Sequence, residues 1–317
     1  MNIFKRIAGW AARLLRDPIL FFSLSWTAEI YGLGKSLRYI SEYPQWLPID
    51  AVFCHGVNFE SRLYKHEREN PARIHIGWHP QLIENNKTIN SKKIIRIPHP
   101  WVRYRHLMNY QLQESRSGTI VFYPHTTGSD RLEWDPRSYL ESLRGLEEKF
   151  QPITICLHHH DATPNNRKLI EEYNFQSVTL GDPFSRMFVD KFYELVCQFK
   201  FATSTDWGSQ TAYCTELGLP YFYFGKTHSI VNVSDENLPK GLVKHEHQDA
   251  EELYKKARSL FSHQYDYVTE DQLKYINEMM CLRNDFDYKN LKKILIYEFF
   301  LGRLSRFFLI WQKADSK

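Results

Sequence analysis

The stretch FATSTDWGSQTAYCTELGLPYFYFG, which runs from Phe201 to Gly225, decides the fold of this chain. It begins as an apolar strand, turns small and polar, and continues as a short helix predicted from Gln210 to Leu217. Gly218 and Pro220 stop that helix, and Tyr221 to Phe224 is an aromatic run suited to a buried strand. A strand, a small-residue loop, a helix, a glycine stop and a second strand together predict a βαβ unit.

The loop in the middle of this unit is rich in hydroxyl groups. Ligands of parallel sheets bind beyond the carboxyl ends of the strands, where a loop leads into a helix. The N-terminus of a helix carries unpaired N–H groups and partial positive charge, which suit phosphate. The loop therefore predicts a phosphate site at Thr205, Asp206, Gly208 and Ser209. Ordinary N-capping uses the same residue types and remains the alternative, above all for Asp206.

The same residues carry a resemblance to a known family. The segment TDWGS at 205–209, followed by LGLP at 217–220, resembles the C-terminal half of GT-B nucleotide-sugar glycosyltransferases. Within that superfamily it is most similar to bacterial surface-polysaccharide enzymes and to CDP-glycerol glycerophosphotransferases. The latter carry T-D-Y-S-S followed at similar spacing by L-G-x-P. Here Trp207 and Gly208 replace Tyr and Ser, and Tyr213 stands where an Asp is expected.

The resemblance implies an α/β chain with a GT-B-like fold, in which two Rossmann-like domains with parallel sheets face each other across a cleft. It implies a glycosyltransferase that moves a sugar from a nucleotide-sugar donor to a glycan or lipid-linked acceptor. Bacterial surface polysaccharides such as lipopolysaccharide or capsule would be the products. Two alternatives stay open: a CDP-glycerol-type polyol-phosphate transferase, and a non-catalytic membrane-associated α/β protein that serves binding or assembly.

Composition fits such a chain and excludes other classes. The chain has 317 residues, enough for two domains, and its 43% hydrophobic content is typical of a packed globular protein. A formal charge of +4 is too mild to argue for nucleic acid as a partner. The five cysteines are scattered without CxxC spacing, which fits a reduced cytosolic compartment and argues against a disulfide framework.

The segment from Pro98 to Ser117 separates two sets of strand–loop–helix units. We therefore predict an acceptor-side domain over 25–112 and a donor-binding domain over 113–285, with a hinge near Ser115 to Gly118. Strands are expected at Glu29–Gly34, Ala51–Cys54, Arg73–Trp78, Lys92–Ile97, Thr119–Tyr123, Ile153–Leu157 and Ser177–Leu180. Helices are expected at Lys35–Tyr43, Arg103–Arg116, Pro136–Phe150, Phe188–Val196, Ala250–Ser262 and Glu270–Met280.

Both ends of the chain are basic and apolar at once. Residues 1–24 mix Lys and Arg with Ile, Leu, Phe and Trp, and residues 286–317 have the same character. Such amphipathic helices are typical of segments that lie on a membrane surface. The alternative is a helix packed on its domain with the basic face in water. Lipid-linked acceptors would place the enzyme in the cytoplasm, peripheral at the inner face of the cell membrane.

His55 is the candidate catalytic residue. It follows the strand predicted at Ala51 to Cys54 and precedes Gly56, so it is placed to reach a cleft. Histidine titrates near neutral pH and can act as a general base toward the acceptor hydroxyl. A similar His-Gly pair in the N-terminal half of the glycerophosphotransferases supports this role by analogy. A structural histidine bonded to the loop backbone is the alternative.

Other loops that follow predicted strands carry small polar residues or histidine. Because the carboxyl ends of parallel strands meet at one edge, their side chains are expected to converge on one rim. The predicted donor-binding residues are His125, Thr126, Thr127, Asp182, Thr205, Asp206, Gly208 and Ser209.

The run His158-His159-His160 invites a metal hypothesis. Adjacent residues at the end of a strand point to opposite sides, which argues against one shared ion. No cysteine or second histidine pair stands at zinc-site spacing. The sequence therefore predicts no metal and no cofactor, with one or two of these histidines lining the donor site. GT-B sites generally need no protein-bound metal, because helix dipoles and side-chain donors offset the charge on the leaving phosphate.

Overall fold

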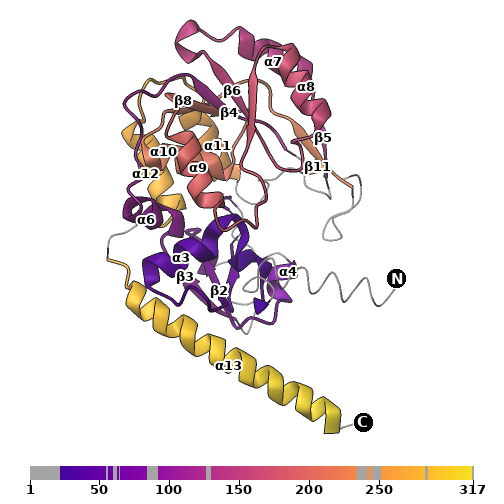
Figure 1. Ribbon diagram of the computed structural model, residues 1–317, viewed down its shortest axis with the longest axis vertical. Helices are drawn as coiled ribbons and strands as arrows, with labels where there is room; N and C mark the ends of the chain where they lie inside the picture. Colours follow the sequence, from indigo (N-terminus) through magenta and orange to yellow (C-terminus); the bar gives the residue numbers. More distant parts are fainter. Residues whose placement is uncertain are drawn as a thin grey trace.

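The computed structural model describes residues 22–54, 56–59, 63, 65–83, 92–125, 130–233, 241, 243–244, 251–282 and 285–315. Figure 1 shows two α/β units stacked along the long axis, with helix α13 beneath the first. Three predicted features lie outside the described residues: His55, the pair Thr126 and Thr127, and nearly all of the N-terminal segment 1–24.

The first unit is built on a three-stranded parallel sheet of order β1-β2-β3. Its strands are β1 (Val52–Phe53), β2 (Ile74–Gly77) and β3 (Lys93–Arg96). The helices around it are η1 (Trp26–Ala28), η2 (Ile30–Gly32), α3 (Leu33–Ser41), α4 (Lys65–Arg68) and α6 (Pro100–Leu107). All four residues of β2 are buried, as expected of a central strand with both faces covered.

The prediction of a strand at Glu29 to Gly34 is wrong. The segment forms 3₁₀ turns that lead into α3, and Tyr31 and Gly32 take left-handed φ values of 56° and 71°. Its aliphatic residues are nevertheless buried, since Ile30 is 6% and Leu33 is 2% exposed. A short apolar run bounded by glycine fits a buried strand and buried helical turns equally well, so periodicity alone misassigned it.

The connector after the first unit also differs from the prediction. Pro100 opens α6, because a proline is well suited to the first helical position. His99 caps this helix by accepting the Trp101 N–H through Nδ1 at 3.3 Å. The helix ends at Leu107, so most of the helix predicted at Arg103 to Arg116 is an irregular connector.

The second unit holds a five-stranded parallel sheet of order β7-β6-β4-β8-β9. Its strands are β4 (Thr119–Phe122), β6 (Ile153–Leu157), β7 (Gln176–Thr179), β8 (Phe201–Ser204) and β9 (Tyr221–Tyr223). Around it lie α7 (Pro136–Arg144), η3 (Glu148–Phe150), α8 (Pro164–Glu172), α9 (Phe188–Val196), α10 (Ser209–Leu217), α11 (Glu251–Phe261) and α12 (Glu270–Met279). The βαβ unit predicted over 201–225 is confirmed as β8, α10 and β9 in parallel pairing.

A small antiparallel sheet stands beside the second unit and has no counterpart in the prediction. It consists of β11 (Val243–Lys244), β10 (Ser229–Asn232) and β5 (Asp130–Glu133) in that order. The two parallel sheets are separate from each other, so the GT-B-like prediction of two Rossmann-like units is confirmed. One apolar cluster nevertheless runs through both units, from Ile76 in β2 to Tyr221 in β9.

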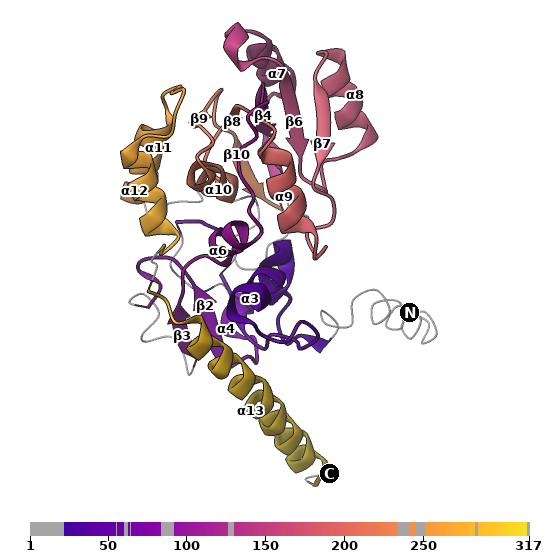
Figure 2. The same ribbon diagram turned by 60° about the vertical axis from the view of Figure 1, so that its left-hand side comes forward.

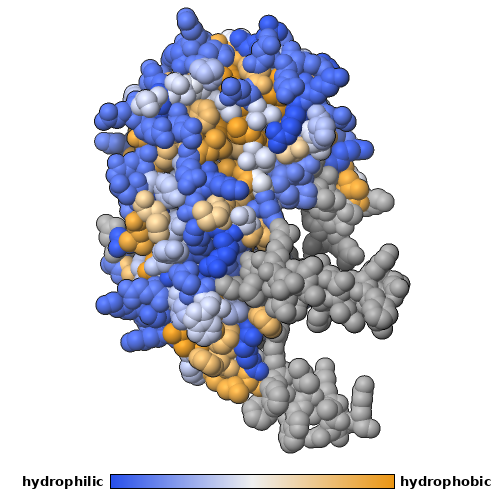
Figure 3. Space-filling model, viewed as in Figure 1, coloured by the Kyte–Doolittle hydropathy of each residue, from blue (hydrophilic) through white to orange (hydrophobic). Residues whose placement is uncertain are grey.

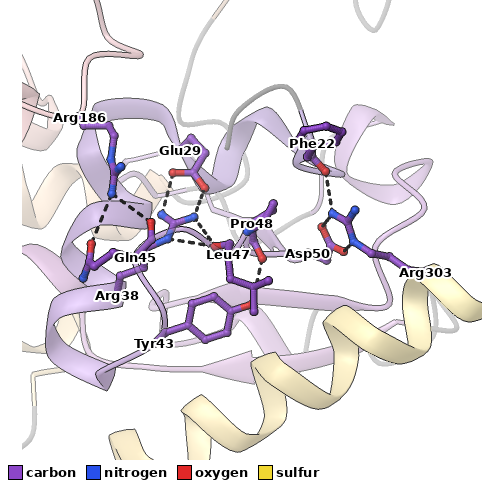
Figure 4. Close-up of polar contacts among 10 residues, drawn as sticks. All are labelled: Phe22, Glu29, Arg38, Tyr43, Gln45, Leu47, Pro48, Asp50, Arg186 and Arg303. Atoms are coloured by element: carbon purple, nitrogen blue, oxygen red, sulfur yellow. Dashed lines mark hydrogen bonds and ion pairs between the residues drawn. The ribbon is translucent and has the colours of Figure 1, made fainter. Parts of the chain in front are cut away.

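Helix α13 (Tyr288–Asp315) begins against the first unit and extends past it, as Figures 1 and 2 show. Leu291 and Leu295 are buried, and the Arg303 guanidinium contacts the buried Asp50 carboxylate at 3.0 Å (Figure 4). On the other side Phe300 and Leu304 are more than half exposed, and Figure 3 shows apolar surface where α13 leaves the first unit. Among the described helices, none combines the length and hydropathy needed to cross a membrane.

Candidate functional site

The strand order of the second sheet locates its ligand crevice. From the central strand β4 the chain moves outward through β6 to β7, then returns to β8 and β9 on the other side. The connection therefore reverses between β4 and β8, and ligands of such sheets bind beyond the carboxyl ends at this switch point. His125 lies beyond the end of β4 and Thr205 directly follows β8. Two of the predicted donor-binding residues thus flank the switch point.

The N-terminus of α10 is in contact with the first unit. Ser209, the first residue of the helix, accepts the Val57 N–H on Oγ at 2.9 Å. Gly56 has φ +67°, and a Cβ added there would collide with the same Oγ, so this close approach needs glycine. A hydroxyl both donates and accepts, and the Ser209 side chain also lies within hydrogen-bonding reach of the Tyr213 hydroxyl. Ser209 therefore joins the loop after β1 to the helix that the sequence predicts as the phosphate site.

Trp207 strengthens the same junction. Its Nε1–H donates to the Val57 carbonyl at 2.8 Å, and its ring packs on Phe59 with centroids 4.7 Å apart. The Gly56 carbonyl accepts from Trp78 Nε1 at 2.8 Å. Trp207 as a whole is 9% exposed. The tryptophan that departs from the family's T-D-Y-S-S pattern thus holds the two units together.

Tyr213, a further departure from that pattern, contributes to the same junction. Its ring stacks on Trp101 at 4.3 Å, and its hydroxyl lies 3.0 Å from His99 Nε2. Burial lowers the pKa of His99 to about 3, so this imidazole is neutral at physiological pH. Since Nδ1 accepts the Trp101 N–H, Nε2 carries the proton and donates it to Tyr213. The Tyr213 hydroxyl therefore has a hydrogen-bond partner, His99, in the first unit.

Thr205 and Asp206 are held by the chain itself. Thr205 is 1% exposed, and its carbonyl accepts from Arg258 Nη1 at 3.0 Å. Asp206 accepts the Trp207 N–H at 2.8 Å and the Tyr254 hydroxyl at 2.8 Å. These contacts fasten α11 to the loop after β8. The N-cap of α10 is Gly208, and Asp206 bonds to the N–H of Trp207 before the helix, so the capping role kept as the alternative for Asp206 is wrong.

His228 belongs to the site although the sequence prediction omits it. Its Nδ1 lies 3.0 Å from Thr205 Oγ1. Burial lowers the pKa of His228, and the neighbouring His125 lowers it further, whereas Asp206 opposes the shift. His125 was predicted because it lies in a loop that follows a strand. The same criterion applies to His228, which lies in the loop after the strand predicted at Tyr221 to Phe224.

Asp182 lies apart from these residues. It follows β7, which is the edge strand on the far side of β6 from β4. Its Oδ1 accepts the Phe184 N–H at 2.9 Å, which closes a local turn. The structure therefore places Asp182 in a turn at the sheet edge and does not bring it to the switch point.

His158, His159 and His160 do not point to opposite sides of a strand, so that part of the prediction against a shared ion is wrong. Strand β6 ends at Leu157, and the chain turns at once, so the alternation of a strand does not extend to His158, His159 and His160. One ligating atom from each of the three lies within 4.8 Å of the others. The exposed His125 ring stacks on His158 at a centroid distance of 4.5 Å. Four imidazoles thus gather beyond β4 and β6.

Comparisons with known proteins bear on this architecture only weakly. In structure the chain is similar to UDP-GlcNAc 2-epimerase from Neisseria meningitidis bound to UDP-GlcNAc, with 15% identity, 84% of this chain and 80% of that chain covered, and a TM-score of 0.37. It is also similar to the wall teichoic acid polymerase TagF soaked with CDPG, with 15% identity, 73% of this chain and 58% of that chain covered, and a TM-score of 0.38. No protein-family model and no curated protein sequence matches the chain. The fold therefore rests on the strand pairings.

Proposed function

We propose that the chain is a glycosyltransferase of the GT-B type that takes a sugar from a nucleotide-sugar donor. The observation that carries this proposal is the gathering of His125, Thr205 and His228 around the β4/β8 switch point, next to the N-terminus of α10. We assign residues 25–112 to the acceptor side, 113–285 to the donor side and 286–317 to a C-terminal helix. The acceptor would be a glycan or a lipid-linked glycan of a bacterial surface polysaccharide.

The donor phosphates would lie at the carboxyl edge of the second sheet. Gly208 caps α10 without a side chain, and the Gln210 amide and the Ser209 hydroxyl lie beside this helix N-terminus as polar groups that could face an anion. The imidazoles of His125 and His228 would supply N–H donors at the same edge of the sheet. These donors would stabilise the charge that develops on the leaving nucleotide. Thr126 and Thr127 remain predicted donor contacts in the loop after β4, whereas the position of Asp182 gives its donor role no support.

His55 would act as the base that deprotonates the acceptor hydroxyl. The residues after it carry the supporting contacts, since Gly56 and Val57 lie against Ser209 at the start of α10. A base on the first unit and an anion site on the second would then meet across the junction. In this scheme the transfer step itself uses no metal ion, and the nucleotide leaves with a proton donated from solvent or from a nearby imidazole.

Nucleotides should protect the folded chain against heat. A ligand that binds only the native state adds about 2.7 kcal/mol of apparent stability at one hundred times its Kd. We expect one of UDP, GDP, CMP and CDP, at millimolar concentration, to raise the melting temperature, and the matching nucleoside to leave it unchanged. His228→Ala should reduce the rise, whereas His263→Ala, an exposed histidine after α11, should keep it.

Two outcomes of this experiment would redirect the proposal. A flat response to all four nucleotides would favour the non-catalytic binding protein. A response to CMP and CDP alone would favour the polyol-phosphate transferase. Product mass spectrometry with the protecting nucleotide's sugar or glycerol conjugates would then identify the transferred group.

We further propose that the chain lies on the inner face of the cell membrane. The basic amphipathic sequence of 1–24 suits a membrane surface. Helix α13 adds an exposed row of side chains that begins with a lysine and continues with apolar residues. The row recurs at helical spacing and consists of Lys293, Tyr297, Phe300 and Leu304. Such a row can enter the boundary between headgroups and acyl chains while the helix stays parallel to the surface.

Deletion of Met1 to Arg16 should move the chain from the membrane fraction to the soluble fraction. Raised salt should weaken the association of the full chain, because part of the attraction is to anionic lipids. Flotation with vesicles that contain or lack anionic lipid measures both effects. Unchanged flotation of the deletion variant would mean that the segment packs on its domain instead.

A further inference from the structure

The histidine turn after β6 is a separate chemical feature of the donor-side unit. We define the histidine turn as His158, His159 and His160, with His125 stacked on its first member. The ring centroids of His159 and His160 lie 3.8 Å apart, and those of His158 and His159 lie 4.3 Å apart. Four imidazoles packed this closely cannot all carry charge, because like charges at such distances repel.

The nitrogen positions suit a metal ion. His158 Nε2 and His159 Nδ1 lie 3.2 Å apart. Two nitrogens that share a tetrahedral zinc ion at about 2.0–2.1 Å lie about 3.3 Å from each other, so this pair already has the required spacing. The third ligating atom, from His160, lies within 4.8 Å of the other two. His160 is exposed, so a side-chain rotation can bring its nitrogen into the same shell without disturbing the core.

We propose that His158, His159 and His160 bind one divalent transition-metal ion of the Zn²⁺ class, with a fourth position open to solvent. Three histidines with an open position form a known zinc-binding set, and imidazole also accepts Co²⁺, Ni²⁺ and Cu²⁺. The site lies beside the proposed donor site, because His158 stacks on His125, but none of its three ligands is given a step in the proposed transfer reaction.

Metal titration of the full chain without any affinity tag tests this site, and no nucleotide is needed. Co²⁺ should bind at one equivalent and give the strong visible absorption of a tetrahedral complex, which Zn²⁺ should then displace. Zn²⁺ should also raise the melting temperature by mass action. His159→Ala should weaken the affinity by at least the roughly 10–100-fold that loss of an outer-shell partner causes. His160→Ala, at an exposed position, should weaken it without a cost to folding.

The control is His263→Ala, which removes an exposed histidine outside the turn and should retain the affinity of the unaltered chain. Melting temperatures without metal show whether each variant is folded. Absence of saturable binding at one equivalent would overturn the proposal, as would equal affinities for the unaltered chain and both turn variants. Protection by inorganic phosphate but not by Zn²⁺ would also overturn it and would identify the turn as an anion site.

Discussion

His55→Ala is expected to lower the turnover of sugar transfer roughly a hundredfold or more while nucleotide affinity stays nearly unchanged. A general base acts on the acceptor hydroxyl in the transition state and makes no contact with the bound nucleotide. The two quantities should therefore separate, with turnover measured on the acceptor and affinity measured by nucleotide titration. Full turnover of His55→Ala on the true acceptor would remove the base from the mechanism.

Ser209→Ala is the matched variant on the other side of the junction. It should weaken donor binding, because it removes a hydroxyl from the head of α10. Its Oγ also accepts the Val57 N–H, so the variant loses one contact between the units. A neutral hydrogen bond contributes only about 0.5–1.5 kcal/mol, so the fold should persist. Ser209→Ala with unchanged donor affinity would limit this serine to holding the loop after β1.

Glu29→Ala is expected to cost about 3–5 kcal/mol of unfolding free energy, because it leaves a buried guanidinium without its counter-charge. The Arg38 side chain is 0% exposed, and it contacts the two carboxylate oxygens of Glu29 at 2.9 and 2.6 Å (Figure 4). Arg38 also donates to the Leu47 carbonyl, which fixes the segment before β1. In urea unfolding, the lost stability should appear as a lower midpoint concentration, with the dependence of the unfolding free energy on urea unchanged.

Glu141→Ala provides the control for this experiment. Glu141 pairs with Arg144 on the surface of α7, where both side chains are more than half exposed. Such exposed pairs contribute about 0–1 kcal/mol. If Glu29→Ala shifted the urea midpoint no more than Glu141→Ala, the buried pair would not be a major source of stability in the first unit.

The sequence by itself determined those elements whose signals are local. The unit from Phe201 to Gly225 forms as predicted, because apolar runs set its strands and Gly218, with φ 89°, ends its helix in a left-handed turn. Parallel pairing of the second sheet follows from the alternation of strands with helices. The convergence of His125 and Thr205 follows in turn, because residues after adjacent parallel strands share one edge.

Only the tertiary structure decided which partners these residues have. Ser209 and Val57 are 152 residues apart in sequence, and Tyr213 and His99 are 114 apart, so no local pattern could pair them. The roles of Trp207 and Tyr213 as contacts between the units were therefore invisible in the motif. The histidine turn was missed for another reason. The end of β6 at Leu157 was predicted correctly, but the sequence did not show that the chain turns directly after the strand and brings the three imidazoles together.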